Sequence, residues 1–173
     1  MPFNNNVSFS SVPFDLIHSD IWGLALVLTK GGSQYFVIFV DDFSRYTWFY
    51  LLHHRSELVS IYQIFHKMIE TQLNCTVKIF WSYSAQEYND KSFLSFLDSK
   101  GTLPHWSCHY TSQQNGPAIQ KHCYILDVVY TLLILASISK CFWVEVALTA
   151  FYTINRVPSS TTYNRSHFKL FYG

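Results

Sequence analysis

Histidine and cysteine side chains gather in the second half of the chain, where they could offer ligands to a metal ion. The group consists of His105, Cys108, His109, His122 and Cys123. Imidazole nitrogen and thiolate sulfur are the ligands that zinc prefers, but zinc fingers place them in closely spaced pairs at set intervals. These five residues do not match that spacing, so we interpret them as ordinary buried or surface residues.

The carboxylates offer a second kind of metal chemistry, because Mg²⁺ requires oxygen ligands held at fixed positions. Asp20 stands near the end of a predicted strand, in the segment HSDIWG. Asp41 and Asp42 follow the next strand and are typical of turn and capping chemistry. Glu87 follows a later strand. Any metal chemistry therefore depends on the elements that hold Asp20 near other ligands.

Three strands joined by short connections are predicted near the start of the chain. In the first, alternation places Leu16, His18 and Asp20 on one face. The second is a continuous apolar run, which suits a buried central strand. The predicted strands are 16–22, 35–40 and 46–52, and the predicted turns are 29–34, with the hairpin glycines Gly31 and Gly32, and 41–45.

Helices and strands alternate in the rest of the chain. Capping residues predict helices that begin after Ser56, after Asn89 or Asp90, after Asn115 and at Ser139. The predicted elements are helix 57–73, strand 77–83, a helix ending near Gly101, strand 105–109, helix 116–136 and a helix from 139 to 155, before Pro158. This order predicts an α/β fold, with a mixed five-stranded sheet flanked by helices and a C-terminal helical extension. It is the order of the ribonuclease-H-like fold.

Several long segments resemble the integrase core of Copia-type retrotransposons. They are PFDLIHSDIWG (13–23), YFVIFVDDFSRYTWFYLL (35–52), FHKMIETQLN (65–74), YTSQQNGPA (110–118) and FWVEVALTAFYTINRVPSS (142–160), while HFKLFYG (167–173) resembles the segment after that core. The resemblance implies a catalytic core over residues 13–157 and a post-core tail fragment over 158–173. Residues 1–12 are expected to be a disordered or remnant segment.

The resemblance implies phosphoryl transfer on DNA, in which three carboxylates of a D,D-35-E set hold two Mg²⁺ or Mn²⁺ ions. Asp20 corresponds to the first carboxylate. The segment SYSAQEY (82–88) places Tyr83 at the second position, and QQNGPAIQK (113–121) places Ile119 at the third. The 35 residues between positions 83 and 119 keep the interval that names the group. We therefore interpret both changes as substitutions, and expect no productive binding of the metal pair.

Other residues are poor replacements for the missing carboxylates. Glu87 matches a family position that is not a metal ligand, and Asp127 lies about 12 Å beyond Ile119 along a helix. Tyr83 is an unattractive nucleophile, because a phenol has a pKa of about 10 and no activating base is evident.

The long predicted helix has an apolar face at steps of four and three residues. Its members are Ile119, Cys123, Leu126, Tyr130 and Leu133. We expect this face to pack on the sheet, with Ile119 extending the apolar stripe where a glutamate would have pointed toward the strand ends.

DNA is the partner that the resemblance implies, with Gln113, Gln114, Asn115 and Lys121 as its nucleic-acid-binding residues. Binding is expected to be weak, because basic residues expected near 120 and 123 are Gln120 and Cys123. Ala85 and Gln86 replace family glycines, so the neighbouring loop is expected to be less flexible.

Composition adds limits of its own. Charged residues make up 13% of the chain, below the roughly 25% of soluble domains, and the net charge is +1. DNA-binding domains usually carry a clear basic excess, which this chain lacks, so its charge alone does not indicate nucleic-acid binding.

The four cysteines form no C-x-x-C pair, which favours a reduced intracellular setting. The longest apolar stretch, 128–139, is shorter than the ~20 residues of a membrane span, so no membrane partner is expected.

These observations predict a retrotransposon integrase core that descends from an integrase, or polynucleotidyl transferase, and has lost its activity. The alternative is a non-catalytic module that uses the same fold to bind nucleic acid or protein. A third interpretation is a chain that aggregates through exposed apolar helices between Val128 and Ile154. The protein is expected in the nucleus if it acts as an integrase. The sequence leaves open whether the chain forms a homo-oligomer. The aromatic residues Tyr46, Trp48, Phe49 and Tyr50 are interpreted as core rather than as a base-stacking platform.

Overall fold

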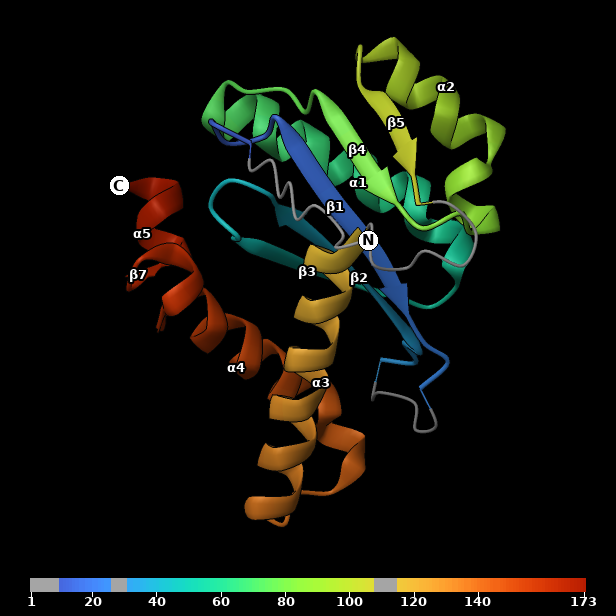
Figure 1. Ribbon diagram of the computed structural model, residues 1–173. Helices are drawn as coiled ribbons and strands as arrows, with labels where there is room; N and C mark the ends of the chain where they lie inside the picture. Colours follow the sequence, from blue (N-terminus) through green and yellow to red (C-terminus); the bar gives the residue numbers. More distant parts are fainter. Residues whose placement is uncertain (1–9, 26–30, 108–114) are drawn as a thin grey trace, which may run out of the picture.

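The computed structural model describes residues 10–25, 31–107 and 115–173, apart from the side chain of Thr161. Its centre is a five-stranded sheet in the order β3-β2-β1-β4-β5 (Figure 1). The strands are β1 (Leu16–Trp22), β2 (Tyr35–Asp41), β3 (Thr47–Leu52), β4 (Ile79–Ser82) and β5 (Leu103–Trp106). The pairs β1–β2 and β2–β3 are antiparallel, while β1–β4 and β4–β5 are parallel. The predicted mixed sheet is confirmed.

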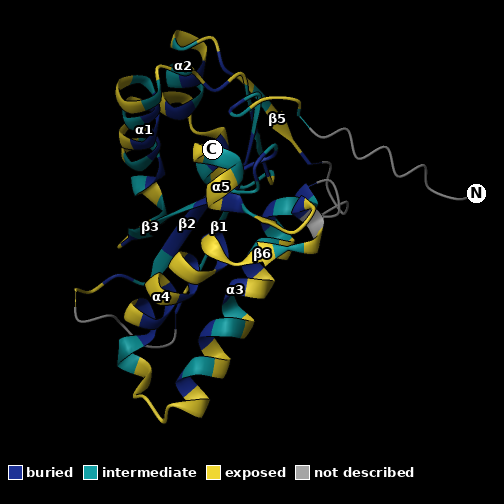
Figure 2. Ribbon diagram, turned by 90° about the vertical axis from the view of Figure 1, so that its left-hand side faces the viewer, coloured by how far each residue is buried: buried dark blue, intermediate teal, exposed yellow. Residues whose placement is uncertain are grey.

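Helices cover both faces of this sheet. The helices α1 (Leu58–Met68) and α2 (Lys91–Ser99) pack on one face, and α3 (Gly116–Leu135) and α4 (Trp143–Arg156) pack on the other. Alternation along β2 divides the core, because Val37 and Phe39 face α1 while Phe36, Ile38 and Val40 face α3 and α4. Figure 2 shows buried residues concentrated where the helices meet the sheet.

The smaller elements complete the chain. Short 3-10 turns span Arg55–Glu57, Gln86–Asn89, Lys140–Phe142 and Ser160–Thr162, and a π-helical turn, Ile69–Leu73, follows α1. The C-terminal part forms a small hairpin of β6 (Pro158–Ser159) and β7 (Arg165–Ser166), then α5 (His167–Tyr172). The structure thus places helix α5 inside the segment 158–173 that was expected to be a tail.

Helix α5 packs against the core instead of standing apart from it. The Phe171 ring lies 5.4 Å from the Phe14 ring and 5.2 Å from the Trp48 ring, measured between centroids. Tyr46 stacks on Phe171 at 5.1 Å. Two of the aromatic residues interpreted as core, Tyr46 and Trp48, therefore pack against α5 through Phe171.

Most predicted elements agree with the structure, but the buried face of the long helix was predicted correctly only in part, at Leu133 and at the partly buried Leu126. The residues of α3 that are buried are Ala118, His122, Ile125, Val129 and Leu133. Of the predicted face, Cys123 is exposed and Tyr130 is 53% exposed. The cause is that α3 is apolar around most of its circumference, with Tyr124, Ile134 and Leu135 also exposed. Periodicity therefore could not distinguish the face that packs from the face beside it.

The remaining differences are at element ends. Strand β5 begins at Leu103 rather than at residue 105, and the end of the predicted strand, 108–109, lies outside the described residues, as do residues 29–30 of the first predicted turn. Asp90 caps α2 as predicted, since its side chain accepts hydrogen bonds from the amides of Ser92 and Phe93. Gly101 has the expected left-handed φ of +69°. Asn115 stands at the start of α3, but its side chain does not cap the helix.

Helix α3 is long and apolar enough to cross a membrane, by length and composition. Core helices of proteins without a membrane pass the same test. In α3 one side faces the sheet and α4, through Ile125, Val129 and Leu133. This contact is typical of a core helix that leaves its other side uncovered.

Candidate active site

Asp20 lies in the middle of the sheet, on the face that α3 covers. Strand β1 pairs in parallel with β4, and the last register pair joins Ser19 to Ser82. Tyr83 directly follows Ser82, so the same register places position 83, just past the end of β4, beside Asp20 in β1. The Tyr83 side chain is 36% exposed. The structure therefore brings together the first two positions of the predicted carboxylate set.

The Asp20 carboxylate has a partner that was not predicted from the sequence. The His122 Nδ1 atom lies 2.7 Å from the Asp20 Oδ2 atom. The His122 side chain is only 5% exposed, and its ring lies against Phe36 at 4.9 Å between centroids. A buried imidazole thus fills the space beside the one family-typical carboxylate of the site.

Ile119 stands one turn before His122 on α3, about 4.5 Å along the helix axis. Its side chain is half-buried. The β1–β4 register thus places position 83 beside Asp20, and position 119 lies one helical turn from the Asp20–His122 pair. That these three are the catalytic positions stays a prediction. They hold one carboxylate, one phenol and one hydrocarbon side chain, with an imidazole between the strand and the helix.

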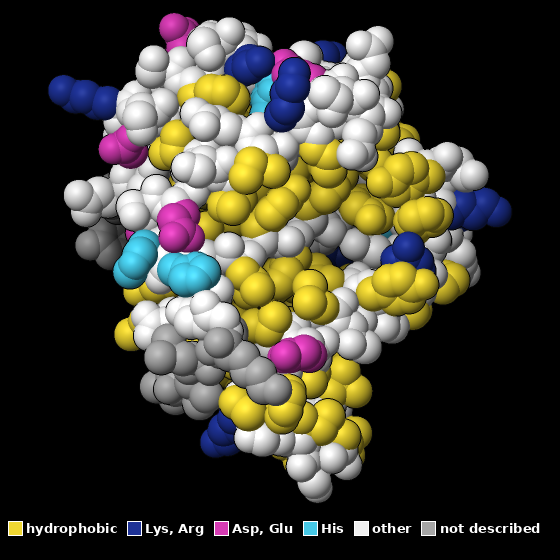
Figure 3. Space-filling view, turned by 180° about the vertical axis from the view of Figure 1, so that it is seen from behind, with side chains coloured by type: hydrophobic (Ala, Val, Ile, Leu, Met, Phe, Trp, Pro, Cys, Tyr) yellow, Lys and Arg dark blue, Asp and Glu magenta, His cyan; other side chains and the backbone are white. Residues whose placement is uncertain are grey.

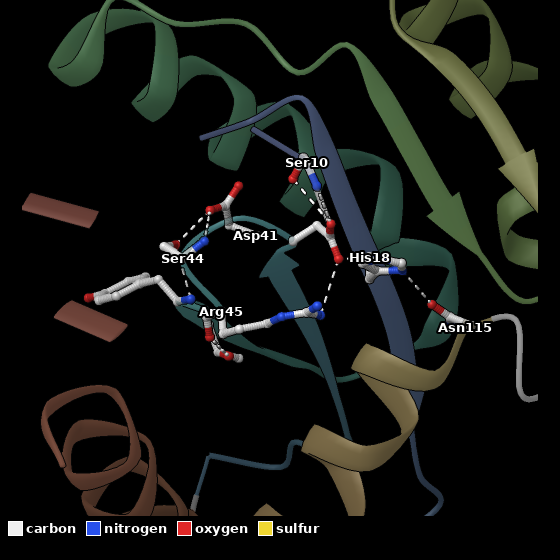
Figure 4. Close-up of polar contacts among 9 residues, drawn as sticks. Ser10, His18, Asp41, Ser44, Arg45 and Asn115 are labelled. Carbon is white, nitrogen blue, oxygen red and sulfur yellow. Dashed lines mark hydrogen bonds and ion pairs between the residues drawn. The ribbon is translucent and has the colours of Figure 1, made fainter. Parts of the chain in front are cut away.

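A buried polar network holds the start of α3 on β1 (Figure 4). The Asn115 side-chain amide donates to the Ser19 carbonyl oxygen at 3.0 Å, and its oxygen faces His18 Nδ1 at 3.2 Å. His18 Nε2 faces Asp42 Oδ1 at 3.2 Å. Both ring nitrogens of His18 therefore lie within hydrogen-bonding distance of a side-chain oxygen, one from the start of α3 and one from the turn after β2.

Asp42 closes this network on the side of the β2–β3 turn. Burial alone would raise its pKa, but the hydrogen bonds from His18 and the Ser10 amide, together with the charge of Arg45, lower the pKa below its usual value. The Arg45 guanidinium lies 3.2 Å from Asp42 Oδ1. Asp42 is thus a structural carboxylate.

Asp41 has the turn role that was predicted for it. Its carboxylate accepts from the Ser44 hydroxyl at 2.6 Å and from the Phe14 amide at 2.8 Å. Burial raises the pKa of Asp41, against the opposing effect of these hydrogen bonds.

Two of the predicted nucleic-acid-binding residues can be placed, since Gln113 and Gln114 lie outside the described residues. Asn115 is fully buried, and both ends of its amide are used within the protein. Lys121 is half-buried, with its Nζ atom 3.1 Å from Nε2 of His167 on α5. The structure gives both residues contacts within the protein, Asn115 to β1 and Lys121 to α5, and their role in nucleic-acid binding stays a prediction.

Glu87 is also engaged within the protein. Its Oε1 atom pairs with Arg55 Nη1 at 2.8 Å, and the Arg55 guanidinium lies over the Tyr35 ring at 5.6 Å. Beside this pair lies a cavity of about 320 Å³, lined by Arg55, Ser56, Leu58, Val59, Gln86, Glu87, Asp90 and Ser92. The hydroxyl of the neighbouring Tyr88 bonds to the Ser19 Oγ atom at 2.8 Å. These contacts connect the loop after β4 to the 3-10 turn before α1 and to β1, and leave Glu87 paired with a cation.

The Lys121–His167 contact makes stability depend on pH. Burial lowers the pKa of Lys121 to about 8, with the charge of Arg45 adding to the effect. Burial lowers the pKa of His167 to about 4, with Lys121 adding to it. A lysine whose pKa is depressed on folding binds fewer protons in the folded state, so stability rises with pH between the folded and unfolded pKa values.

We therefore expect the free energy of unfolding to increase between pH 8 and about 10, where tyrosines begin to ionise in the unfolded chain. Lys121→Met should remove this increase, as measured by urea unfolding at a series of pH values. Lys67→Met is the matched control, because Lys67 is 73% exposed. An increase that persists in Lys121→Met would contradict the assignment.

The residues of the site do not fit the metal pair that the resemblance implies. Two divalent ions need several oxygen ligands, whereas Asp20 is the one carboxylate among the three positions, and it is already bonded to His122. Within residues 10–25, 31–107 and 115–173, no group of three or more His, Cys, Asp or Glu side chains could hold a metal ion. The rejected zinc set is tested only in part, because Cys108 and His109 lie outside the described residues.

Comparisons with known proteins agree with this architecture. The integrase core domain family matches residues 11–112. The Pol polyprotein of transposon RE2 from Arabidopsis thaliana is 32% identical over the whole chain, and that of transposon TNT 1-94 from Nicotiana tabacum is 34% identical over 145 residues, 84% of the chain. The chain spans only 12% and 11% of those polyproteins.

Two solved structures share the fold. A simian T-cell lymphotropic virus intasome in complex with the PP2A regulatory subunit B56 gamma matches 94% of this chain and 55% of its own, with a TM-score of 0.74 and 15% identity. The HTLV-2 integrase catalytic core in complex with magnesium, in a trimeric form, matches 94% of this chain and 99% of its own, with a TM-score of 0.67 and 11% identity.

The fold is that of an integrase catalytic core, of ribonuclease-H-like architecture. The chain belongs to the integrase core domain family, and its relatives are Copia-type and Ty1 retrotransposon polyproteins. The predicted family and fold are confirmed. The family match ends before α3, so it does not reach positions 119 and 122, which the structure places on that helix.

Proposed function

We propose that the chain is a retrotransposon integrase core that does not cut or join DNA. The observation that carries this proposal is the state of Asp20. Its carboxylate pairs with the buried His122 imidazole at 2.7 Å, and the neighbouring positions carry Tyr83 and Ile119. Phosphoryl transfer by two metal ions needs the attacking and leaving oxygens clamped between the ions, and two of the three carboxylates that would hold such a pair are replaced.

A strand-transfer assay tests this proposal. Purified protein is incubated with a labelled duplex end and a target plasmid, with Mg²⁺ or Mn²⁺, and joined products are counted. We expect the parent chain and Asp20→Asn to give the same background. Product that requires Mn²⁺ and is lost in Asp20→Asn would contradict the proposal, because it would show that Asp20 supports catalysis without its partners.

A second candidate function is a non-catalytic module that binds nucleic acid. The observation that favours it lies outside the Asp20 site, on the surface of α4 and α5, where exposed aromatic and cationic side chains stand together. DNA binding and self-association are proposals for this chain, suggested by the intasome and by the oligomeric forms of the structures with the same fold.

A further inference from the structure

An exposed stack of rings around one arginine crosses from α4 to α5. The Arg156 guanidinium carbon lies 3.7 Å from the centroid of the Tyr152 ring and 4.7 Å from that of Phe168. Phe168 lies 4.7 Å from Tyr172, which in turn lies 5.8 Å from Tyr46. We call Tyr152, Arg156, Phe168 and Tyr172 the arginine–aromatic stack.

The rings of this stack are open to solvent. Tyr152 is 62% exposed, Tyr172 is 54% exposed and Phe168 is 36% exposed, although aromatic side chains usually bury most of their area. Figure 3 shows cationic side chains among hydrophobic ones on the right-hand side of that view, which is the side of α4 and α5. The Arg156 guanidinium thus lies against both Tyr152 and Phe168, and the exposed faces of the rings are what the stack offers to another flat group.

The surroundings of the stack are cationic. Residues 146–173 contain Arg156, Arg165 and Lys169 but no aspartate or glutamate. All three side chains are exposed, and none of them forms an ion pair with a carboxylate of the described residues. Over the whole chain basic and acidic residues nearly cancel, so this segment is a local basic excess.

We propose that the arginine–aromatic stack is a binding surface for single-stranded nucleic acid. Flat exposed rings offer stacking partners to unpaired bases of any sequence, and the three cations offer partners to the phosphates. A protein partner is a poorer fit, because three cations without carboxylate partners would have to be desolvated in its interface. A duplex is also a poorer fit, since its bases are stacked on each other and cannot reach the rings.

The arginine–aromatic stack is separate from the Asp20 site, whether or not that site is catalytic. Asp20 and His122 lie between β1 and α3, whereas the stack is built by α4 and α5. Asp20→Asn should therefore leave oligonucleotide binding unchanged. The proposal that the Asp20 site is inactive and the proposal that the arginine–aromatic stack binds nucleic acid can therefore be disproved independently of each other.

The test is fluorescence anisotropy of a labelled oligothymidylate across a salt series, with the full chain. We expect the parent to bind the single strand more tightly than a duplex of equal length. Tyr152→Leu should weaken binding about tenfold, as loss of one stacked base does. Arg165→Ala with Lys169→Ala should reduce the slope of log affinity against log salt by about 0.7 for each phosphate that the variant no longer neutralises.

Matched controls separate this surface from general effects. Tyr130→Leu removes a ring that is 53% exposed on α3, and Lys67→Ala removes a cation that is 73% exposed on α1. Both should bind like the parent. Arg156→Lys keeps the charge but loses the planar group, so affinity should fall while the salt slope stays the same. A parent that does not bind the single strand, a preference for the duplex, or a Tyr152→Leu variant that binds like Tyr130→Leu would overturn the proposal.

Discussion

Replacing Phe39 with alanine is expected to lower the free energy of unfolding by about 4 kcal/mol. Phe39 is fully buried in the central strand β2. Its ring stacks on Phe65 of α1 at 4.5 Å and meets Tyr62 edge-on at 5.7 Å. The substitution would leave a cavity between the sheet and α1 that stiff neighbouring rings cannot fill. Since domains are stable by only about 5–15 kcal/mol, much of the fold's stability depends on this contact.

Urea unfolding followed by circular dichroism measures the effect, with Tyr130→Ala as the control. Tyr130 is 53% exposed, so its removal should change stability by no more than about 0.5 kcal/mol. If Phe39→Ala costs no more than Tyr130→Ala, the packing of the sheet on α1 is not as described.

Rebuilding the carboxylates is expected to restore metal binding. The triple variant Tyr83→Asp, Ile119→Glu and His122→Asn places two new carboxylates beside Asp20 and removes the imidazole that pairs with it. The register of β1 and β4 makes position 83 a neighbour of Asp20, and position 119 lies one turn before His122. We expect Mn²⁺ affinity, measured by electron paramagnetic resonance titration, to rise at least tenfold over the parent, roughly the effect of one well-placed group around a metal.

Two controls show which change matters. The double variant Tyr83→Asp, Ile119→Glu keeps His122. It should bind Mn²⁺ more weakly than the triple variant, because the His122 imidazole is still hydrogen-bonded to the Asp20 carboxylate. Adding Asp20→Asn to the triple variant should reverse the gain. A triple variant that binds no better than the parent would mean that the three positions do not converge as the structure has them.

The sequence predicted the fold well because its strongest signals are local. The apolar run of β2 and the cap at Asp90 each depend on few neighbouring residues, and the structure has them where they were expected. The buried face of α3 could not be predicted in the same way. That helix is apolar on nearly every side, and only the contact with the sheet and α4 decides which side is covered.

The positions of the candidate site were predicted from the sequence, but its contacts were not. Asp20 was assigned from its segment HSDIWG, and Tyr83 and Ile119 from the interval between them, because a spacing survives the loss of the residues at its ends. The contact between Asp20 and His122 joins residues far apart in the chain, so no local sequence pattern predicts it. The one sequence signal was a histidine three residues after position 119, within the same predicted helix. The same holds for Asn115, whose bonds to Ser19 and His18 exist only once α3 is docked.

The measurement that tests the central claim most directly is the Mn²⁺ titration of the parent chain beside Asp20→Asn. The claim is that the Asp20 carboxylate is satisfied by His122 and holds no catalytic metal. It predicts that the two proteins give superimposable titrations, with no binding that depends on Asp20. A Mn²⁺ site that is present in the parent and lost in Asp20→Asn would contradict it.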